Sequence, residues 1–315
     1  MKRTDGMLDL NACFDNKNYH ELVTAGILKP LKNKIDNYKD DGKLSNFILF
    51  INGEMYYVKE CAIWYAELIV NEFLKLIGID CLDYDVATFD GEVYVLSKYY
   101  KKYDCEYISG DEILKDFYTD VDSQEYIDVI NPSEQDRKRL EFYLNNLESI
   151  WLALDYRYKN HPDKEKIVYN LMMELKKRYF LKTFLLTDVD YHPGNWEIEE
   201  GEEIKLSPVY DNAACLENDI FGLPFGCTPE STEYGIFKHL DAFFGISASE
   251  EIEYLDGFLE GVKPSLFDEA IRRVEEKYGL TIPGKMNYSF RYKFNYNEIK
   301  SKIEKYRGNN GRKVS

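Results

Sequence analysis

The sequence lacks long hydrophobic runs, paired cysteines and histidine clusters. No stretch approaches the roughly 18 apolar residues of a membrane-spanning helix, so no span is expected. The six cysteines are scattered without a Cys-x-x-Cys pair, which is typical of reduced thiols in a cytoplasmic protein. The four histidines show no metal-binding spacing. We therefore expect neither a membrane protein nor a zinc protein, and the first residues do not resemble a signal peptide.

Positive charge is also scarce. The chain has 57 Asp and Glu against 40 Lys and Arg, a net charge of −17. The electrostatic field of this negative charge repels phosphates, so direct binding to nucleic acid or to an anionic membrane is disfavoured. The tyrosine-rich stretch 99–103 suggests base stacking at first sight, but Asp104 and Glu106 follow it. With 44% hydrophobic residues in 315, we expect a globular protein of about two domains or lobes.

A β-rich pattern occupies the first third of the chain. Two strand-like runs flank Asn52-Gly53, which is a strong signal for a hairpin because a type I′ turn needs positive φ at both central residues. Lys59 would end the second strand. The apolar residues of 62–78 recur at intervals of three and four, which predicts a helix closed by Gly78. Two further strands are expected at 86–89 and 93–97.

The remainder of the chain has a mostly helical pattern. Helices are expected over 133–158 and 163–186, and two more are expected to open at the capping signals of Ser247 and Ser265. A strand-like segment at 194–208 interrupts them and turns near Gly201. The sequence thus predicts an α+β protein. Residues 1–100 would form a small, β-rich, nucleotide-binding N-lobe, and residues 101–315 a larger helical C-lobe.

The densest cluster of reactive side chains follows the helix at 163–186. Asp190, His192 and Asn195 stand there on a loop that Pro193 and Gly194 separate from the helix. The hairpin turning near Gly201 would bring Asp211, just past its far end, close to Asn195. Carboxylate and amide oxygens suit Mg²⁺, which usually keeps waters and also binds substrate phosphates.

These side chains include most of the groups that phosphoryl transfer needs. Asp190 would accept a proton from an incoming hydroxyl, while Asn195 and Asp211 would hold the metal. Such a site also needs a distant lysine for the phosphates, which Lys59 on its strand can supply. Glu67, on the following helix, can pair with that lysine.

At this point the sequence resembles a known family. Asp190-x-His192-x-x-Asn195, followed by Ser207-Pro208-Val209-Tyr210-Asp211, is similar to the HipA-like serine/threonine kinases. The closer match is to the short CtkA-type members, which lack the extra amino-terminal subdomain. The resemblance spans roughly residues 42–216.

The resemblance implies a bilobed protein-kinase-like fold that uses ATP and Mg²⁺ to phosphorylate Ser or Thr of a protein. By position, it implies Asp190 as catalytic base, Asn195 and Asp211 as Mg²⁺ ligands, and Lys59 as the phosphate-contacting lysine. His192 belongs to the same loop, where it would orient the loop rather than act as base. An antitoxin-like partner protein is implied by the resemblance alone.

The nucleotide-binding parts are less regular. The family's glycine-rich loop should precede the first strand of the hairpin, where this chain has a single glycine. The candidate phosphate contacts are Gly42, Lys43 and Ser45, and Ser45 is also the candidate for autophosphorylation. The hinge that would contact adenine falls at Ser97 and Tyr99.

Two alternatives stay open. The atypical loop 40–46, and Tyr191 where family members often have Arg, motivate a non-catalytic nucleotide-binding scaffold or pseudokinase. A kinase acting on a small molecule or a lipid head group is the other, because similar catalytic loops serve both kinds of acceptor. Residues 104–130, rich in Asp and Tyr, would then shape the acceptor cleft.

Overall fold

The computed structural model describes residues 3–4, 7–9, 46–51, 54–60, 63–89, 92–119, 147–188, 191, 193–215 and 248–311. The chain divides into two compact units. Unit 1 comprises residues 1–101, 211–213 and 265–286, and unit 2 comprises residues 102–210, 214–264 and 287–315. Both units contain sheet and helix, so the predicted α+β class is confirmed.

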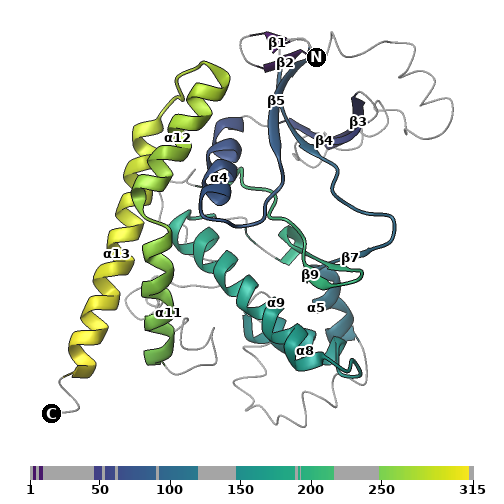
Figure 1. The fold of residues 1–315 in the computed structure, drawn as a ribbon, viewed down its shortest axis with the longest axis vertical. Coiled ribbons are helices and arrows are strands. Elements are labelled where there is room, and N and C mark those ends of the chain that lie inside the picture. The colour runs from purple at the N-terminus through teal and green to yellow at the C-terminus, as the bar shows by residue number, and fades with distance from the viewer. Residues whose placement is uncertain are drawn as a thin grey trace. The chain divides into compact units, whose positions relative to one another are not determined.

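A mixed sheet is the centre of unit 1 (Figure 1). Its strand order among the described residues is β1-β2-β5-β6-β4-β3, with β2 parallel to β5 and the other neighbours antiparallel. The strands are β1 (Arg3–Thr4), β2 (Met7–Asp9), β3 (Asn46–Ile51), β4 (Glu54–Glu60), β5 (Tyr84–Phe89) and β6 (Glu92–Lys98). The predicted β3–β4 hairpin is confirmed, with pairs from Asn46–Lys59 to Ile51–Glu54. Its turn, Asn52-Gly53, lies outside the described residues.

Helix α4 (Trp64–Leu76) follows the hairpin, within the predicted range 62–78. Its apolar side chains are buried because they recur on one face. Gly78 closes the helix with φ of +74°, a left-handed conformation that glycine adopts without steric cost.

Helix α12 (Pro264–Tyr278) also belongs to unit 1 from residue 265 onward. The Phe73 and Phe267 rings pack edge to face with centroids 5.3 Å apart, and the Tyr278 hydroxyl donates to the Asp85 carboxylate at 2.9 Å. The helix was expected to open at the Ser265 cap. It begins one residue earlier, because Pro264 suits the first helical position, where no N–H donor is needed.

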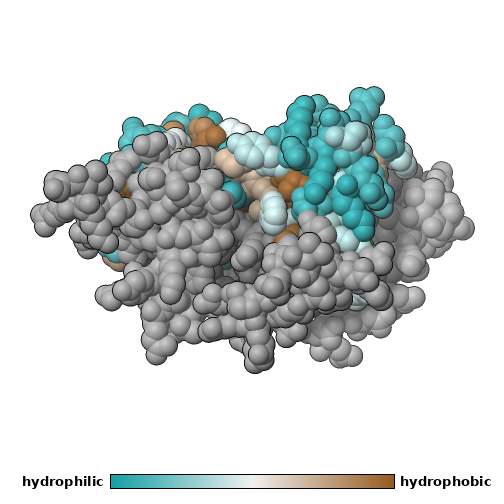
Figure 2. Space-filling view, turned by 90° about the horizontal axis from the view of Figure 1, so that it is seen from below, coloured by the Kyte–Doolittle hydropathy of each residue, from teal (hydrophilic) through white to brown (hydrophobic). Residues whose placement is uncertain are grey.

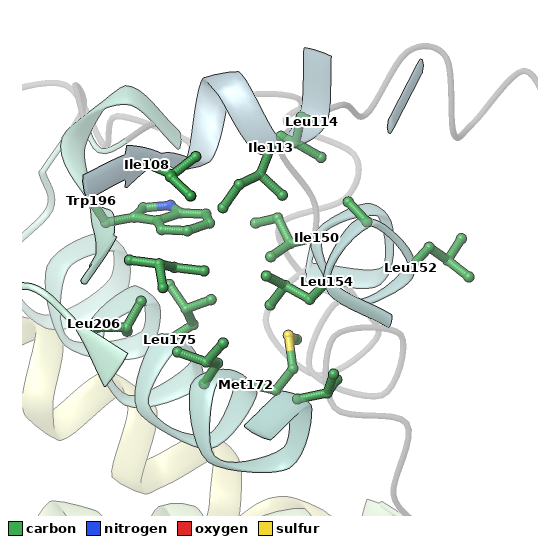
Figure 3. Packing of buried hydrophobic residues seen from close by; sticks show 14 of the residues in the cluster. Ile108, Ile113, Leu114, Ile150, Leu152, Leu154, Met172, Leu175, Trp196 and Leu206 are labelled. Atoms are coloured by element: carbon green, nitrogen blue, oxygen red, sulfur yellow. The ribbon is translucent and has the colours of Figure 1, made fainter. Parts of the chain in front are cut away.

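Unit 2 surrounds an apolar core that Figure 3 shows from close by. Trp196 belongs to it and is 1% exposed, and Figure 3 shows its ring near Ile108 of a strand and Ile113 of a helix. The elements that supply the core are β7 (Glu106–Ser109), α5 (Gly110–Thr119), α8 (Leu147–Arg157), α9 (Lys164–Tyr179), β8 (Glu197–Glu200) and β9 (Ile204–Leu206). The end of α8 agrees with the predicted helix 133–158, and residues 133–146 lie outside the described part.

The predicted helix 163–186 changes its winding part-way. It is α-helical in α9 and continues as the π-helix η2 (Phe180–Leu185). The Leu186 N–H accordingly donates to the Leu181 carbonyl, five residues earlier, at 2.9 Å. Apolar spacing alone does not separate α from π winding. Short π segments often occur at functional sites.

The other helices described in unit 2 are α11 (Ala248–Gly261) and α13 (Lys285–Gly311), the latter from residue 287 onward. The buried Tyr292 hydroxyl of α13 donates to the Val262 carbonyl at 2.6 Å. Among the residues that the structure describes, no helix is both long and apolar enough to cross a membrane. On the face shown in Figure 2, most of the described surface is hydrophilic, and hydrophobic residues are visible in small areas only.

Candidate functional site

Strand β4 presents Lys59 on the face opposite its core-facing neighbour. Side chains alternate along a strand, so Val58, 1% exposed, faces the core while Lys59 faces the other way. Lys59 Nζ lies 2.5 Å from Asp211 Oδ1. The two side chains are 25% and 36% exposed. The structure thus brings together the predicted phosphate-contacting lysine and one predicted metal ligand.

The backbone at Asp211 adopts a left-handed conformation. Its φ is +52°, one of two positive values at non-glycine residues in the described part of the chain. This conformation is uncommon for residues other than glycine, although aspartate tolerates it better than most. The Asp211 N–H donates to the Tyr84 hydroxyl at 3.1 Å. A contact from β5 therefore helps to hold the carboxylate-bearing residue in an unusual backbone geometry.

Glu67 of α4 binds the next residue. Its side chain is 1% exposed, and its two carboxylate oxygens accept from the Asn212 N–H at 3.0 and 3.1 Å. A buried carboxylate needs such donors, because loss of its hydration is otherwise costly. A side-chain hydrogen bond also links Glu67 with Tyr84. The predicted pairing of Glu67 with Lys59 stays a prediction.

The Tyr84 hydroxyl can serve both neighbours because it keeps its proton. Burial and then the nearby Glu67 carboxylate raise the pKa of Tyr84 well above its ordinary value. The neutral hydroxyl donates to Glu67 and accepts from the Asp211 N–H. Tyr84 and Glu67 thus form one polar network under residues 211 and 212, which we call the 211–212 cradle.

Asn195 lies in unit 2, at the end of the 3₁₀ turn η3 (Pro193–Asn195). It is 8% exposed, and the Tyr210 hydroxyl donates to the neighbouring Gly194 carbonyl at 3.2 Å. Asn195 was expected to begin a strand, but β8 begins at Glu197 because the turn intervenes.

The predicted hairpin that turns near Gly201 is confirmed as the antiparallel pair β8–β9. Its pairs run from Ile198–Leu206 to Glu200–Ile204. Beyond the ladder, the Ser207 N–H donates to the Glu197 carbonyl at 2.8 Å. Arg178 of α9 donates to the Ser207 carbonyl at 2.7 Å, which anchors the chain directly after β9.

Other predicted site residues lie outside the described part of the chain. They are Gly42, Lys43, Ser45, Asp190 and His192. Their roles stay predictions.

The predicted hinge residues are described. Ser97 is buried within β6, opposite Tyr57 of β4 and Tyr84 of β5. Tyr99 follows the strand, and its N–H donates to the Met55 carbonyl at 2.8 Å. The ring centroids of Tyr57 and Tyr99 lie 5.0 Å apart. The strand pairing therefore continues for one residue beyond β6.

Tyr84 and Asn212 were missed by the sequence reasoning. A tyrosine in a strand resembles any other core tyrosine, and Asn212 contributes its backbone N–H rather than a recognisable side chain. Asn212 was adjacent to the predicted ligand Asp211, which is the one signal that pointed to it.

No protein-family model matches the sequence, and no curated protein sequence does either. Two solved structures are similar in fold. One is the proinflammatory kinase CtkA of Helicobacter pylori, at 15% identity and a TM-score of 0.50, covering 83% of this chain and 89% of that one. The other is HipA of Shewanella oneidensis, from a toxin–antitoxin complex with HipB and operator DNA. It has 13% identity and a TM-score of 0.51, covering 81% of this chain and 63% of that one.

The chain has a HipA-like kinase fold. The bilobed, kinase-like α+β architecture predicted from the sequence is thereby confirmed. In a HipA-like kinase fold, the contact between Lys59 and Asp211 joins two residues that the sequence had assigned to one phosphate and metal site.

Proposed function

We propose that this protein is an ATP- and Mg²⁺-dependent kinase that phosphorylates serine or threonine residues of a protein. The observation that carries the proposal is the ion pair of Lys59 with Asp211, whose backbone is held by the 211–212 cradle. An ion pair that only stabilised the fold would not need the left-handed backbone of Asp211, or the buried Glu67 carboxylate that binds the next residue. A metal and phosphate site does require a carboxylate and a cation fixed in one place.

The Asp211 carboxylate, which is partly exposed, suits Mg²⁺. The Asn195 amide is the second ligand that the sequence predicts, and both groups offer hard oxygen atoms. Mg²⁺ bound by them would neutralise charge on the ATP phosphates. Lys59 would bind the phosphates as a second positive charge. The Asp211 carboxylate would then bind Mg²⁺ in place of the Lys59 ammonium group.

Asp190 is proposed as the base. The acceptor oxygen would form a bond to the γ-phosphorus as the bond from that phosphorus to the bridging oxygen breaks. ADP would leave with the electron pair, and Asp190 would take the hydroxyl proton. The chain's own contribution is positioning and electrostatic stabilisation.

The finer assignments belong to the same proposal. Residues 1–100 would act as the nucleotide-binding lobe and 101–315 as the catalytic lobe, as in the short CtkA-type kinases. Autophosphorylation would occur at Ser45. The HipA neighbour comes from a complex with an antitoxin, which supports an antitoxin-like partner for this chain. A cytoplasmic location is proposed from the six cysteines, which are scattered along the sequence without a Cys-x-x-Cys pair.

The test is phosphate transfer from γ-labelled ATP with Mg²⁺, to the protein itself and to a generic basic protein. Wild type should become labelled or label the acceptor, and Asp190→Ala should do neither. Full activity in Asp190→Ala would contradict the proposal. If wild type shows no label but ATP raises its melting temperature, a pseudokinase is favoured, unless a screen of small-molecule and lipid acceptors finds a labelled product.

A further inference from the structure

A buried ion pair lies at the end of the helix that precedes the catalytic loop. Lys182 Nζ is 2.6 Å from Asp188 Oδ2, and each side chain is 1% exposed. Lysine and aspartate are almost never fully buried unless paired. Such a pair loses much hydration, and well-packed apolar residues of similar volume often stabilise a fold as well. Stability alone therefore does not account for the Lys182–Asp188 pair, and a further role is expected.

Lys182 binds Asp188 through its backbone as well as its side chain. Lys182 lies in the π-helix η2, and its carbonyl accepts from the Asp188 N–H at 2.8 Å. Between them, Thr187 has a left-handed φ of +47°. Two contacts to one residue therefore fix the direction in which the chain leaves η2, two residues before Asp190.

The same ammonium group also contacts the residue that follows Asp190. Lys182 Nζ lies 5.3 Å from the centroid of the Tyr191 ring, within the range of a cation–π interaction. Tyr191 in turn packs edge to face on Tyr179, with centroids 4.8 Å apart. Burial acts to lower the pKa of Lys182, but the Asp188 carboxylate holds it above its ordinary value, so the group stays charged.

A third group joins the pair from further along the chain. The Cys215 thiol, fully buried, donates to Asp188 Oδ2 at 3.4 Å. Along the sequence, Asp190, Asn195 and Asp211 all lie between residues 188 and 215. The contact therefore ties together the two ends of the segment that carries these three residues.

We propose that Lys182 is a positioning residue, which holds Asp188 and Tyr191, the described residues that flank the proposed base Asp190 in the sequence, and so restrains the catalytic loop. The proposal rests on the kinase function proposed above. Lys182 itself touches neither substrate nor metal in this account. The proposal gives a role to the buried pair formed by Lys182 of η2 and Asp188 beyond it, and it gives Tyr191 a role where family members often have arginine.

The test compares three variants with a matched control. Lys182→Met and Asp188→Leu each remove one partner of the buried ion pair and should lower the melting temperature. The double variant removes both charges, so its melting temperature should recover toward that of wild type. Leu185→Ala is the control, because truncating this fully buried residue of the same π-helix leaves a cavity but keeps both charges of the pair.

If Lys182 positions Asp190, the double variant should lose about 10²-fold in kcat while KM for ATP is unchanged. Leu185→Ala should lose melting temperature but keep its kcat per folded molecule. A double variant with both a recovered melting temperature and the kcat of wild type would overturn the proposal, because the pair would then be structural only.

A second readout does not depend on activity. Amide hydrogen exchange at Tyr191 and Asn195 should be faster in the double variant than in wild type or Leu185→Ala, because the loop has lost its restraint. Unchanged exchange would overturn the positioning role. If wild type transfers no phosphate, the kinase proposal fails, and the exchange measurement still decides whether Lys182 orders the loop.

Discussion

Lys59 and Asp211 lie 152 positions apart in the chain, and their side chains form an ion pair of 2.5 Å within unit 1. Both are partly exposed, and pairs of this kind typically contribute only about 0–1 kcal/mol to stability. Their interest is chemical. A cation for phosphates and a carboxylate for a metal are side by side, and the carboxylate's backbone is fixed by Tyr84 and Glu67.

Lys59→Met should separate folding from function. The free energy of unfolding should fall by no more than about 1 kcal/mol. The rate of phosphate transfer should fall by about 10²-fold, because the Lys59 ammonium no longer neutralises the negative charge of the ATP phosphates. The control is Lys75→Met, which breaks the exposed pair with Asp83 in the same unit. Unchanged transfer in Lys59→Met, or an equal loss in Lys75→Met, would contradict the role of Lys59.

Tyr84→Phe should weaken Mg²⁺ use. It removes the hydroxyl that accepts the Asp211 N–H, and a buried donor left without a partner costs about 1–3 kcal/mol. Because Asp211 loses its backbone support, the Mg²⁺ concentration at half-maximal transfer should rise by about tenfold.

The matched control for Tyr84→Phe is Tyr278→Phe. It removes another partly buried hydroxyl of unit 1, which donates to Asp85 at 2.9 Å. It should lose stability without a change in Mg²⁺ dependence. The same Mg²⁺ dependence in Tyr84→Phe and wild type would show that the 211–212 cradle does not act on the metal ligand.

Two glycines should respond in opposite directions to replacement by alanine. A Cβ at Gly110 would lie 2.6 Å from the Pro193 carbonyl oxygen and closer still to the Trp196 ring. Gly110→Ala should therefore lose about 1–3 kcal/mol of stability by overpacking. At Gly257, inside α11, such a Cβ would have no atom of the described residues within 4 Å apart from its own helix backbone and chain neighbours, so Gly257→Ala should gain about 1 kcal/mol. Urea unfolding of both variants tests this, and equal effects would be inconsistent with the packing around Trp196.

The Glu200 carboxylate should make stability depend on pH. Burial acts to raise its pKa, but hydrogen bonds from Arg157 and Tyr158, at 2.9 and 2.6 Å, outweigh burial and lower the pKa from 4.5. A lowered pKa in the folded state stabilises the fold above the unfolded value. That contribution is lost as the pH falls through the folded value.

Glu200→Gln should therefore be less stable than wild type by about 1–3 kcal/mol at neutral pH, and the difference should shrink below pH 4.5. Urea unfolding at several pH values measures it, with the exposed Glu202→Gln as control. A difference that stays constant with pH would rule out this carboxylate as the titrating group.

Local patterns predicted the elements well where one dominant signal was present. Asn52-Gly53 predicted the β3–β4 hairpin, and the spacing of apolar residues predicted α4. The start of α12 at Pro264 was missed, because Ser265 looked like a cap. The change from α9 to the π-helix η2 was missed as well, since both windings place apolar residues at similar spacing.

Long-range contacts were harder to predict. Lys59 and Asp211 were both chosen from the sequence, and the structure brings them together. Tyr84 beside Asp211, and Lys182 paired with Asp188, were not foreseen, because neither residue differs in pattern from an ordinary core tyrosine or a helix lysine. Nothing in the periodicity of residues 265–278 indicated that they would pack in the same unit as α4.

The most direct measurement is label transfer from γ-labelled ATP and Mg²⁺ by wild type and Asp211→Asn, side by side with ATP-induced shifts of the melting temperature. Wild type should give labelled product and Asp211→Asn should give none, although both remain folded. Equal labelling by the two proteins, or none by wild type with any acceptor, would contradict the claim that Asp211 and Lys59 serve phosphoryl transfer.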